Sequence, residues 1–207
     1  MKFVVAIDGP AAAGKGTIAK AVANYFGFSH LDSGLLYRAV AAKTLKGADP
    51  VAASEELHED DLKADNLRSP EVAQMASKVA ALEDVRLALI DFQHSFAQQD
   101  GGAVIDGRDI GTVICPDAAV KLYITASPEA RAKRRFQELL NGSKSLTLEA
   151  VFKDVKERDE RDATRHASPL KAASDAITID NTELTIEAAV KAAIEVIETA
   201  FERTKQL

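Results

Sequence analysis

A glycine-rich segment directly after an apolar run constrains the fold of this chain more than any other feature. The apolar run covers residues 3–7, and the segment after it reads Gly9-Pro10-Ala11-Ala12-Ala13-Gly14-Lys15-Gly16-Thr17. Glycines let the backbone turn tightly, so that successive N–H groups point at an anion, and a following helix directs its positive end there. A strand, such a loop and a helix together predict a nucleoside triphosphate site in an α/β fold.

Lys15 and Thr17 supply the charged and polar side chains of this loop. The lysine brings a positive charge to the β- and γ-phosphates, and the hydroxyl beyond it reaches toward Mg²⁺. The strict pattern has Ser or Thr directly after the lysine, whereas Gly16 stands there in this chain. We expect Gly9 to Thr17 to bind the phosphates of a nucleoside triphosphate, with Lys15 on the surface. The alternative is an ordinary strand-turn-helix corner.

Strand-like and helix-like runs alternate along the rest of the chain, which predicts a parallel sheet covered by helices on both faces. Apolar residues recur every three or four positions from Ile186 to Phe201 and predict a last helix. A second helix is expected to start at Ser127, with Pro128 just inside it. The strands are expected at residues 3–7, 28–31, 103–105, 120–125 and 176–179.

The composition excludes several classes of protein. A net charge of −6 gives no general basic field, so we expect no nucleic acid as partner. Cys115 is the single cysteine and cannot form an internal disulfide, which fits a reducing cytoplasm, and we expect it to be buried and inert. No apolar run is long enough for a membrane span. The acidic residues between 55 and 61 are expected to form a solvated face.

Asp106 follows a second apolar run and precedes Gly107 and Arg108. In enzymes with a phosphate-binding loop, a carboxylate at such a strand end holds Mg²⁺, often through water. Arg108 is then well placed for a second phosphate. The alternative is a solvated turn with a local ion pair.

A highly charged segment covers residues 157–165. On a helix, Arg158, Asp162 and Arg165 share one face because they are spaced by four and seven residues. In isolation, a salt-bridged surface helix would be favoured. The phosphate-binding loop changes that balance, since phosphoryl transfer needs several positive charges and arginine binds phosphate bidentately.

The segment after the second expected strand has the sequence Asp32-Ser33-Gly34-Leu35-Leu36-Tyr37-Arg38. Ser33 is expected to cap the helix that carries Tyr37 and Arg38. A core tyrosine and a surface arginine are the alternative reading of this helix.

These segments together resemble the bacterial cytidylate kinases, a family of nucleoside monophosphate kinases. The resemblance covers nearly the whole chain, and its most specific matches are residues 31–38, 106–113 and 156–170. Segments 76–81 and 85–86 match the base-binding segment of the family, and Lys15-Gly16-Thr17 is typical of monophosphate kinases.

The resemblance implies direct phosphoryl transfer from ATP to CMP or dCMP, with Mg²⁺ as cofactor and with ATP bound by Gly9 to Thr17. Under it, Arg38, Arg108 and Arg165 would bind the acceptor phosphate. The implied reader of the cytosine is the set Ser77, Arg86 and Asp109. Other implied roles are catalysis by Lys15, Arg108, Arg158, Asp162 and Arg165, contacts to ribose and phosphates by Arg158 and Asp162, acceptor binding also by Ser33 and Tyr37, and Mg²⁺ binding by Thr17 and Asp106.

The fold implied is a five-stranded parallel sheet flanked by helices, in one monomeric domain. The core would comprise residues 1–32, 100–126 and 170–207, the acceptor-binding lobe about 33–99 and a short lid about 142–168. Many members carry a three-stranded insertion in the acceptor lobe. Here residues 62–70 are too few for it and 65–70 read as a turn, so we expect a mostly helical lobe.

Three other functions are weighed against this one. The nearest is a related kinase that phosphorylates another nucleotide or a small metabolite. A GTP-binding switch would need an Asn-Lys-x-Asp guanine reader and an Asp-x-x-Gly motif, neither of which occurs in the sequence. A nucleic-acid-binding ATPase is disfavoured by the acidic charge balance.

Overall fold

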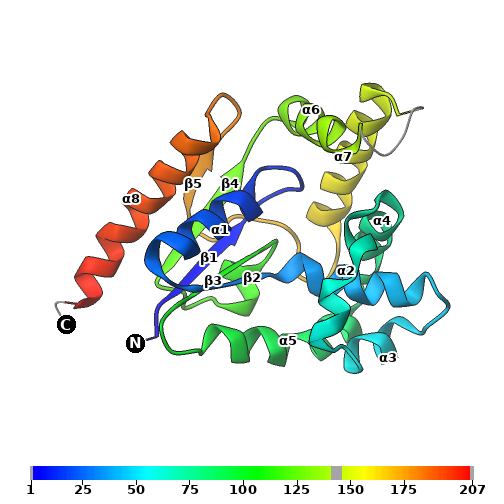
Figure 1. The fold of residues 1–207 in the computed structure, drawn as a ribbon, viewed down its shortest axis with the longest axis horizontal. Helices are drawn as coiled ribbons and strands as arrows, with labels where there is room; N and C mark the ends of the chain where they lie inside the picture. The colour runs from blue at the N-terminus through cyan, green and yellow to red at the C-terminus, as the bar shows by residue number, and fades with distance from the viewer. Residues whose placement is uncertain (1, 141–145, 206–207) are drawn as a thin grey trace.

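A five-stranded parallel sheet forms the centre of the computed structural model, which describes residues 2–140 and 146–205 (Figure 1). The strand order is β2-β3-β1-β4-β5, so the chain crosses over helices between parallel neighbours. Each strand lies within two residues of its expected limits, which confirms the predicted sheet. The strands are β1 (Val4–Asp8), β2 (Ser29–Asp32), β3 (Ala103–Gly107), β4 (Val120–Thr125) and β5 (Ile177–Asp180).

Both faces of the central strands β1 and β3 are buried, as expected for a parallel sheet whose connections are helices. Val5 and Ile7 pack on one face against side chains of α1 and α8, while Ala6 lies on the other face with side chains of α5. The last helix predicted from the periodicity is α8. The bounds of these helices are α1 (Lys15–Phe26), α5 (Glu83–Ala97) and α8 (Ile186–Lys205).

The chain between β2 and β3 forms a helical lobe beside the sheet (Figure 1). Leu36, Val40, Val72 and Leu89 are among the residues of its own buried core. The expected turn at 65–70 contains a short 3₁₀ helix, and the helical character predicted for the lobe is confirmed. Its elements before α5 are α2 (Ser33–Thr44), α3 (Pro50–Glu55), the 3₁₀ helices η1 (Glu59–Lys63) and η2 (Asp65–Arg68), and α4 (Pro70–Val79).

Two packed helices follow β4, namely α6 (Pro128–Leu139) and α7 (Leu148–Thr164). The predicted start of α6 is confirmed: Ser127 Oγ accepts a hydrogen bond from the backbone N–H of Ala130 at 3.2 Å. Residues 142–145, which begin the predicted lid, lie outside the described residues. Helix α7 makes up most of the rest of that segment and also contacts α4.

One predicted cap is wrong. Helix α2 begins at Ser33 itself, and Asp32 is the residue before it. The Ser33 hydroxyl instead donates to the backbone oxygen of Asp106 at 2.8 Å, because the parallel pairing of β2 and β3 brings the two strand ends together. Ser33 therefore joins two strands and does not cap a helix.

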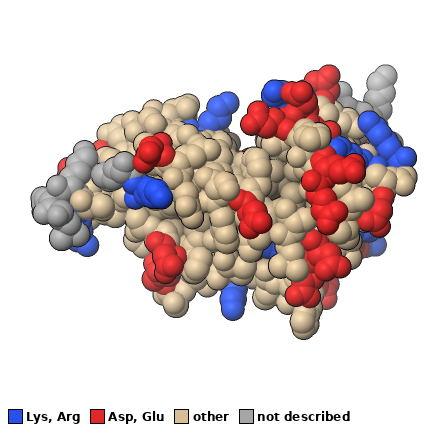
Figure 2. Space-filling model, turned by 90° about the horizontal axis from the view of Figure 1, so that it is seen from below, with Lys and Arg blue, Asp and Glu red and all other residues tan. Residues whose placement is uncertain are grey.

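The acidic residues between 55 and 61 gather on the helical lobe, at the end of the molecule where Figure 2 shows many acidic side chains. Asp61 pairs with Lys43 at 2.7 Å and Asp60 pairs with Lys63 at 2.9 Å. Within residues 2–140 and 146–205, no cluster of acidic, histidine or cysteine side chains forms a metal site, and no helix is long and apolar enough to cross a bilayer. Cys115 is buried, as predicted.

Candidate active site

Three aspartates lie at the carboxyl ends of neighbouring strands. Asp8 ends β1, Asp32 ends β2, and Asp106 in β3 is the register partner of Asp32. Ligands of parallel α/β sheets bind beyond these strand ends. The glycine-rich loop begins at the same edge, directly after Asp8, and the sheet therefore places carboxylates beside the candidate phosphate site.

The glycine-rich loop lies closely against β4. Gly9 has φ 147°, and a Cβ added there would lie 1.9 Å from the backbone oxygen of Ile124, so no larger residue fits. Gly14 has φ 92°, a conformation that favours glycine, and ends the loop just before α1. Ala12 is also left-handed, with φ 57°. The loop thus has the tight turns that the sequence predicts.

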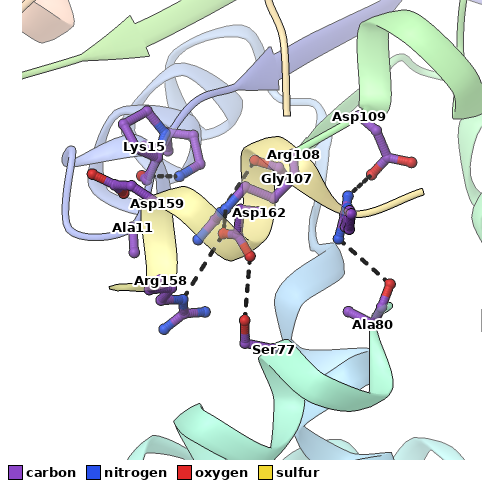
Figure 3. Close-up of polar contacts among 12 residues, drawn as sticks. Ala11, Lys15, Ser77, Ala80, Gly107, Arg108, Asp109, Arg158, Asp159 and Asp162 are labelled. Carbon is purple, nitrogen blue, oxygen red and sulfur yellow. Dashed lines mark hydrogen bonds and ion pairs between the residues drawn. The ribbon is translucent and has the colours of Figure 1, made fainter. Parts of the chain in front are cut away.

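Lys15 contradicts its expected surface position. It is the first residue of α1, it is only 6% exposed, and its Nζ donates to the backbone oxygen of Pro10 at 2.8 Å. The side chain turns back over the loop because the helix starts at this residue (Figure 3). Burial, and next the positive charge of Arg108, lower the pKa of Lys15 to about 7.

Asp8 anchors the chain that follows β3. Its two carboxylate oxygens accept hydrogen bonds from the backbone N–H groups of Ile110 and Gly111, at 2.8 and 2.7 Å. The strongest effect on its pKa is burial, which raises it to about 6 against the opposing effect of these bonds. Asp8 thereby fixes the π-turn at Ile110–Ile114, directly after Asp109.

The carboxylate of Asp106 has one oxygen held and one facing the loop. His30 Nε2 lies 2.8 Å from Oδ1, while a Cβ placed on Gly16 would lie 3.9 Å from Oδ2. Thr17, next to Gly16, is exposed. Mg²⁺ prefers oxygen ligands and is usually bound by one or two carboxylates together with phosphates and water. Asp106 and Thr17 therefore fit the predicted magnesium site.

Arg108, Arg158 and Asp162 form a charged cluster in which Asp162 is buried and the two arginines are partly buried (Figure 3). Arg108 Nε donates to Asp162 Oδ2 at 2.9 Å, and Arg158 Nε lies 4.0 Å from the same oxygen. Two guanidinium groups thus share one carboxylate. Burial and the nearby Arg108 lower the pKa of Arg158 to about 10. Its buried Nε has no hydrogen-bond partner in the described part of the chain, so this cluster can accept an anion.

A second cluster contains Arg86, Asp109 and Arg165. Arg86 Nη2 bonds to Asp109 Oδ2, and its guanidinium lies 5.6 Å from the centre of the Tyr37 ring. Arg165 Nη2 lies 3.6 Å from Asp109 Oδ1. Burial raises the pKa of Asp109, although both arginines oppose that shift. The structure therefore places Arg165 near the expected base reader, and its predicted contact with the acceptor phosphate stays a prediction.

Helix α7 ends at Thr164, one residue before Arg165, whereas the predicted shared face needs Arg158, Asp162 and Arg165 all on the helix. Arg165 follows Thr164 with ψ 141°, so only Arg158 and Asp162 lie on the helix. The turn after the helix is closed by Arg165 Nε, which donates to the backbone oxygen of Ser168 at 2.7 Å. Arg165 nevertheless stays near the other two side chains: burial raises the pKa of Asp162, but the charges of Arg108, Arg158 and Arg165 together lower it.

The helical lobe contacts α7 at the site. Ser77 Oγ, on α4, donates to Asp162 Oδ1 at 3.3 Å (Figure 3). Arg38, on α2, donates to the backbone oxygen of Leu67 at 2.8 Å, and burial lowers its pKa. The predicted acceptor residues from four separate segments thus lie close together where the sheet edge, the lobe and α7 meet.

A family model of cytidylate kinases matches residues 5–60 and 52–199. A cytidylate kinase of Cereibacter sphaeroides (strain KD131) is 61% identical over 198 residues, which is 96% of each chain. The chain belongs to the cytidylate kinase family. A second relative, the cytidylate kinase of Sinorhizobium medicae, is 50% identical over 212 residues, covering 99% of this chain and 100% of its own.

Solved structures of low sequence identity share the fold of this cytidylate kinase family member. A gluconokinase from Sinorhizobium meliloti has a TM-score of 0.55 at 11% identity and covers 99% of this chain and 97% of its own. An uncharacterised protein from Eubacterium ventriosum has a TM-score of 0.58 at 14% identity, over 96% and 99% of the two chains. The phosphate-binding-loop kinase fold predicted from the sequence is confirmed.

Sequence reasoning missed several side chains around the site. The basic run from Arg131 to Arg135 lies on a helix directly after a strand, and this pattern could have indicated residues near the site. Nothing local marks His30 or Asn181, whose partners are 76 and 168 residues away. The missed residues are Asp8, His30, Asp32, Arg131, Arg134, Asp159 and Asn181.

Proposed function

We propose that this protein transfers the terminal phosphoryl group of ATP to CMP and dCMP. The observation that carries the proposal, in a chain of the cytidylate kinase family, is that the glycine-rich loop lies near the Arg108–Asp162–Arg158 cluster. Burial, and next the charge of Arg108, lower the pKa of Lys15 in the loop, and Asp109 follows Arg108 in the chain with Arg86 as its partner. A donor phosphate at the loop and an acceptor phosphate at the arginines would face each other. Asp109 would then lie on the side of the acceptor base.

The ATP side of the site is the loop from Gly9 to Thr17. Its N–H groups and the start of α1 bind the phosphates, and Lys15 exchanges its bond to the Pro10 carbonyl for one to the transferred group. Mg²⁺ bound with ATP neutralises charge on the phosphates. Asp106, through water, and Thr17 would hold it.

The acceptor side provides alignment and charge. Both reacting groups are phosphates, so no strong general base is needed, and the chain lowers the barrier by holding donor and acceptor in line. Arg108 and Arg158 stabilise the negative charge that is spread over the transferred group. Asp162 orients both, because its carboxylate is the shared partner of the two guanidinium groups.

A comparison of acceptors tests the proposal. Purified protein is supplied with Mg²⁺, ATP and one acceptor at a time, and ADP release is followed in a coupled assay. CMP and dCMP should give the highest kcat/KM, ahead of UMP, AMP, GMP and small hydroxyl acceptors such as gluconate. Turnover of a different acceptor in preference to CMP would support the nearest alternative, and tight ATP-analogue binding without any turnover would support a non-kinase function.

Asp109→Asn should narrow the preference for CMP over UMP. Cytosine offers an exocyclic amine that a carboxylate accepts, whereas uracil has a carbonyl in its place. Asp109 Oδ2 is held by Arg86 and Oδ1 lies 3.6 Å from Arg165 Nη2, so Oδ1, the more loosely held oxygen, would accept from the base. The ratio of kcat/KM for the two acceptors should fall about tenfold or more. The control is Asp91→Asn on the exposed face of α5, and an unchanged ratio in Asp109→Asn would place base selection elsewhere.

Asp106→Asn should raise the Mg²⁺ requirement and lower the rate. The substitution keeps the shape of the side chain but removes the charge that orients the water shell of the metal. The Mg²⁺ concentration at half-maximal rate should rise about tenfold. Asp117→Asn, in the exposed turn before β4, is the matched control. Superimposable Mg²⁺ titrations of Asp106→Asn and the wild type would make Asp106 a structural residue.

Further expectations from the sequence, on the lobe, the lid, the oligomeric state, the location and the partners, stay proposals. Residues 33–99 act as the acceptor-binding lobe, and residues 142–168 act as a lid that closes when both nucleotides are bound. The protein works as a monomer in the cytoplasm, and ATP and the cytidine nucleotide are its partners, without nucleic acid or membrane.

A further inference from the structure

Helix α6 carries two arginines, one turn apart, that face the phosphate-binding loop. Arg131 is only 3% exposed. Its Nη1 donates to the backbone oxygen of Ala11 at 3.2 Å, and its Nε donates to that of Ala126, just after β4, at 2.8 Å. A guanidinium on α6 therefore holds one carbonyl of the loop against the central sheet.

Arg134 reaches a second carbonyl of the loop through Asn181. Its Nη1 and Nη2 donate to the side-chain and backbone oxygens of Asn181, at 2.8 and 2.7 Å. Asn181 Nδ2 in turn donates to the backbone oxygen of Ala13 at 2.7 Å. The amide lies so close to the loop that a Cβ added to Gly14 would be 2.9 Å from it.

These contacts supply hydrogen-bond donors to the backbone carbonyls of the loop. A loop that turns its N–H groups toward an anion turns carbonyls the other way, and buried carbonyls need donors. Ala11 and Ala13 receive theirs from α6 and from the residue after β5. Ala12, between them, is held at φ 57°, a conformation that alanine adopts only where the surroundings impose it.

The same arginine is also fixed by α7. Arg131 Nη1 and Nη2 form a bidentate pair with Asp159, at 2.9 and 2.6 Å. Asp159 directly follows Arg158 in α7. One turn of this helix therefore carries both the ion-pair partner of Arg131 and one arginine of the Arg108–Asp162–Arg158 cluster. The loop and α7 are thus connected through a single buried guanidinium.

We propose that α6 positions the phosphate-binding loop, through Arg131 at Ala11 and through Arg134 and Asn181 at Ala13. Asp159 sets the orientation of Arg131 and so links the shape of the loop to α7. The inference rests on the proposed function, since it takes the loop to be the ATP site. The residues named are positioning residues that act through the backbone of the loop.

Asn181→Leu tests the connection at Ala13. Leucine has nearly the shape of asparagine but cannot donate to the carbonyl or accept from Arg134. The affinity for the Mg²⁺ complex of a non-hydrolysable ATP analogue, measured by calorimetry, should fall about tenfold. The KM for CMP should stay within about twofold of the wild type. General loosening of the fold would instead change the affinity for the ATP analogue and the KM for CMP together. Asn24→Leu, on the exposed side of α1, makes the same chemical change away from the loop.

Asp159→Asn tests the link to α7. It should also weaken binding of the ATP analogue severalfold, although within the described residues Asp159 has no hydrogen bond or ion pair to the loop. Glu160→Gln, at the exposed next position, should leave that affinity unchanged. In an Arg131→Lys background, which lacks the bidentate pair, Asp159→Asn should have no additional effect.

Wild-type affinity in Asn181→Leu would overturn the positioning role at Ala13, and wild-type affinity in Asp159→Asn would overturn the link to α7. An equal rise in the KM for CMP would overturn both by indicating a general structural effect. Failure of the proposed function is distinct, because the wild type itself would then bind no ATP analogue or fail to phosphorylate CMP.

Discussion

Replacing Lys15 with alanine should lower kcat/KM about a thousandfold, the scale of losing a charge that stabilises a phosphoryl-transfer transition state. The ammonium group lies over the loop and donates to the Pro10 carbonyl, a partner that it can exchange for a phosphate oxygen. The fold should survive, because burial already disfavours the charged side chain, as its lowered pKa indicates. The thermal midpoint should therefore stay level or rise.

The measurement combines steady-state kinetics with thermal unfolding of the same preparation. Lys20→Ala, at an exposed position of the same helix, controls for the loss of a lysine from α1. Kinetics like those of the wild type in a folded Lys15→Ala protein would remove the loop from the catalytic site altogether.

Arg158→Ala should lower kcat about a hundredfold or more with little change in the thermal midpoint. Arg158 and Arg108 repel each other around one carboxylate, so removing Arg158 relieves like-charge contact and leaves Asp162 paired with Arg108. Activity and stability should thus separate, whereas an arginine with a structural role would affect both. Arg161→Ala, one turn along α7, is the control.

Hydrogen exchange across α7 adds a test of the lid. Amides of residues 154–164 should exchange faster in the empty enzyme than with both nucleotides bound, if this helix closes over them. Equal exchange in the two states, together with an active Arg158→Ala variant, would leave α7 as a solvated scaffold helix, since exposed ion pairs contribute little.

Features that depend on residues close together in the chain could be predicted from the sequence. The strands, the loop from Gly9 to Gly14 and the last helix follow from local periodicity and glycine placement. The acceptor residues were expected from the resemblance, and their roles stay predictions. The surface position assigned to Lys15 was wrong because the return of its side chain over the loop depends on where α1 starts. The end of α7 before Arg165 likewise depends on a turn closed by Ser168.

The contacts that could not be predicted join residues far apart in the chain. Arg131 and Ala11 are separated by 120 residues, and Ser33 bonds to Asp106 across 73. Local pattern says only that a basic helix follows β4 and that a serine follows β2. The partners are decided by the strand order, which places the ends of β1, β3 and β4 side by side.

The buried state of Lys15 connects nucleotide affinity to proton concentration. With a pKa of about 7 in the empty protein, this amine is largely uncharged in mildly alkaline solution. An arriving polyphosphate favours the ammonium form, so binding above neutrality draws in a proton from the solvent. By linkage, affinity for the nucleotide must then decline as the solution becomes more alkaline, by up to about tenfold for each pH unit. The enthalpy of binding would likewise depend on the buffer that supplies the proton.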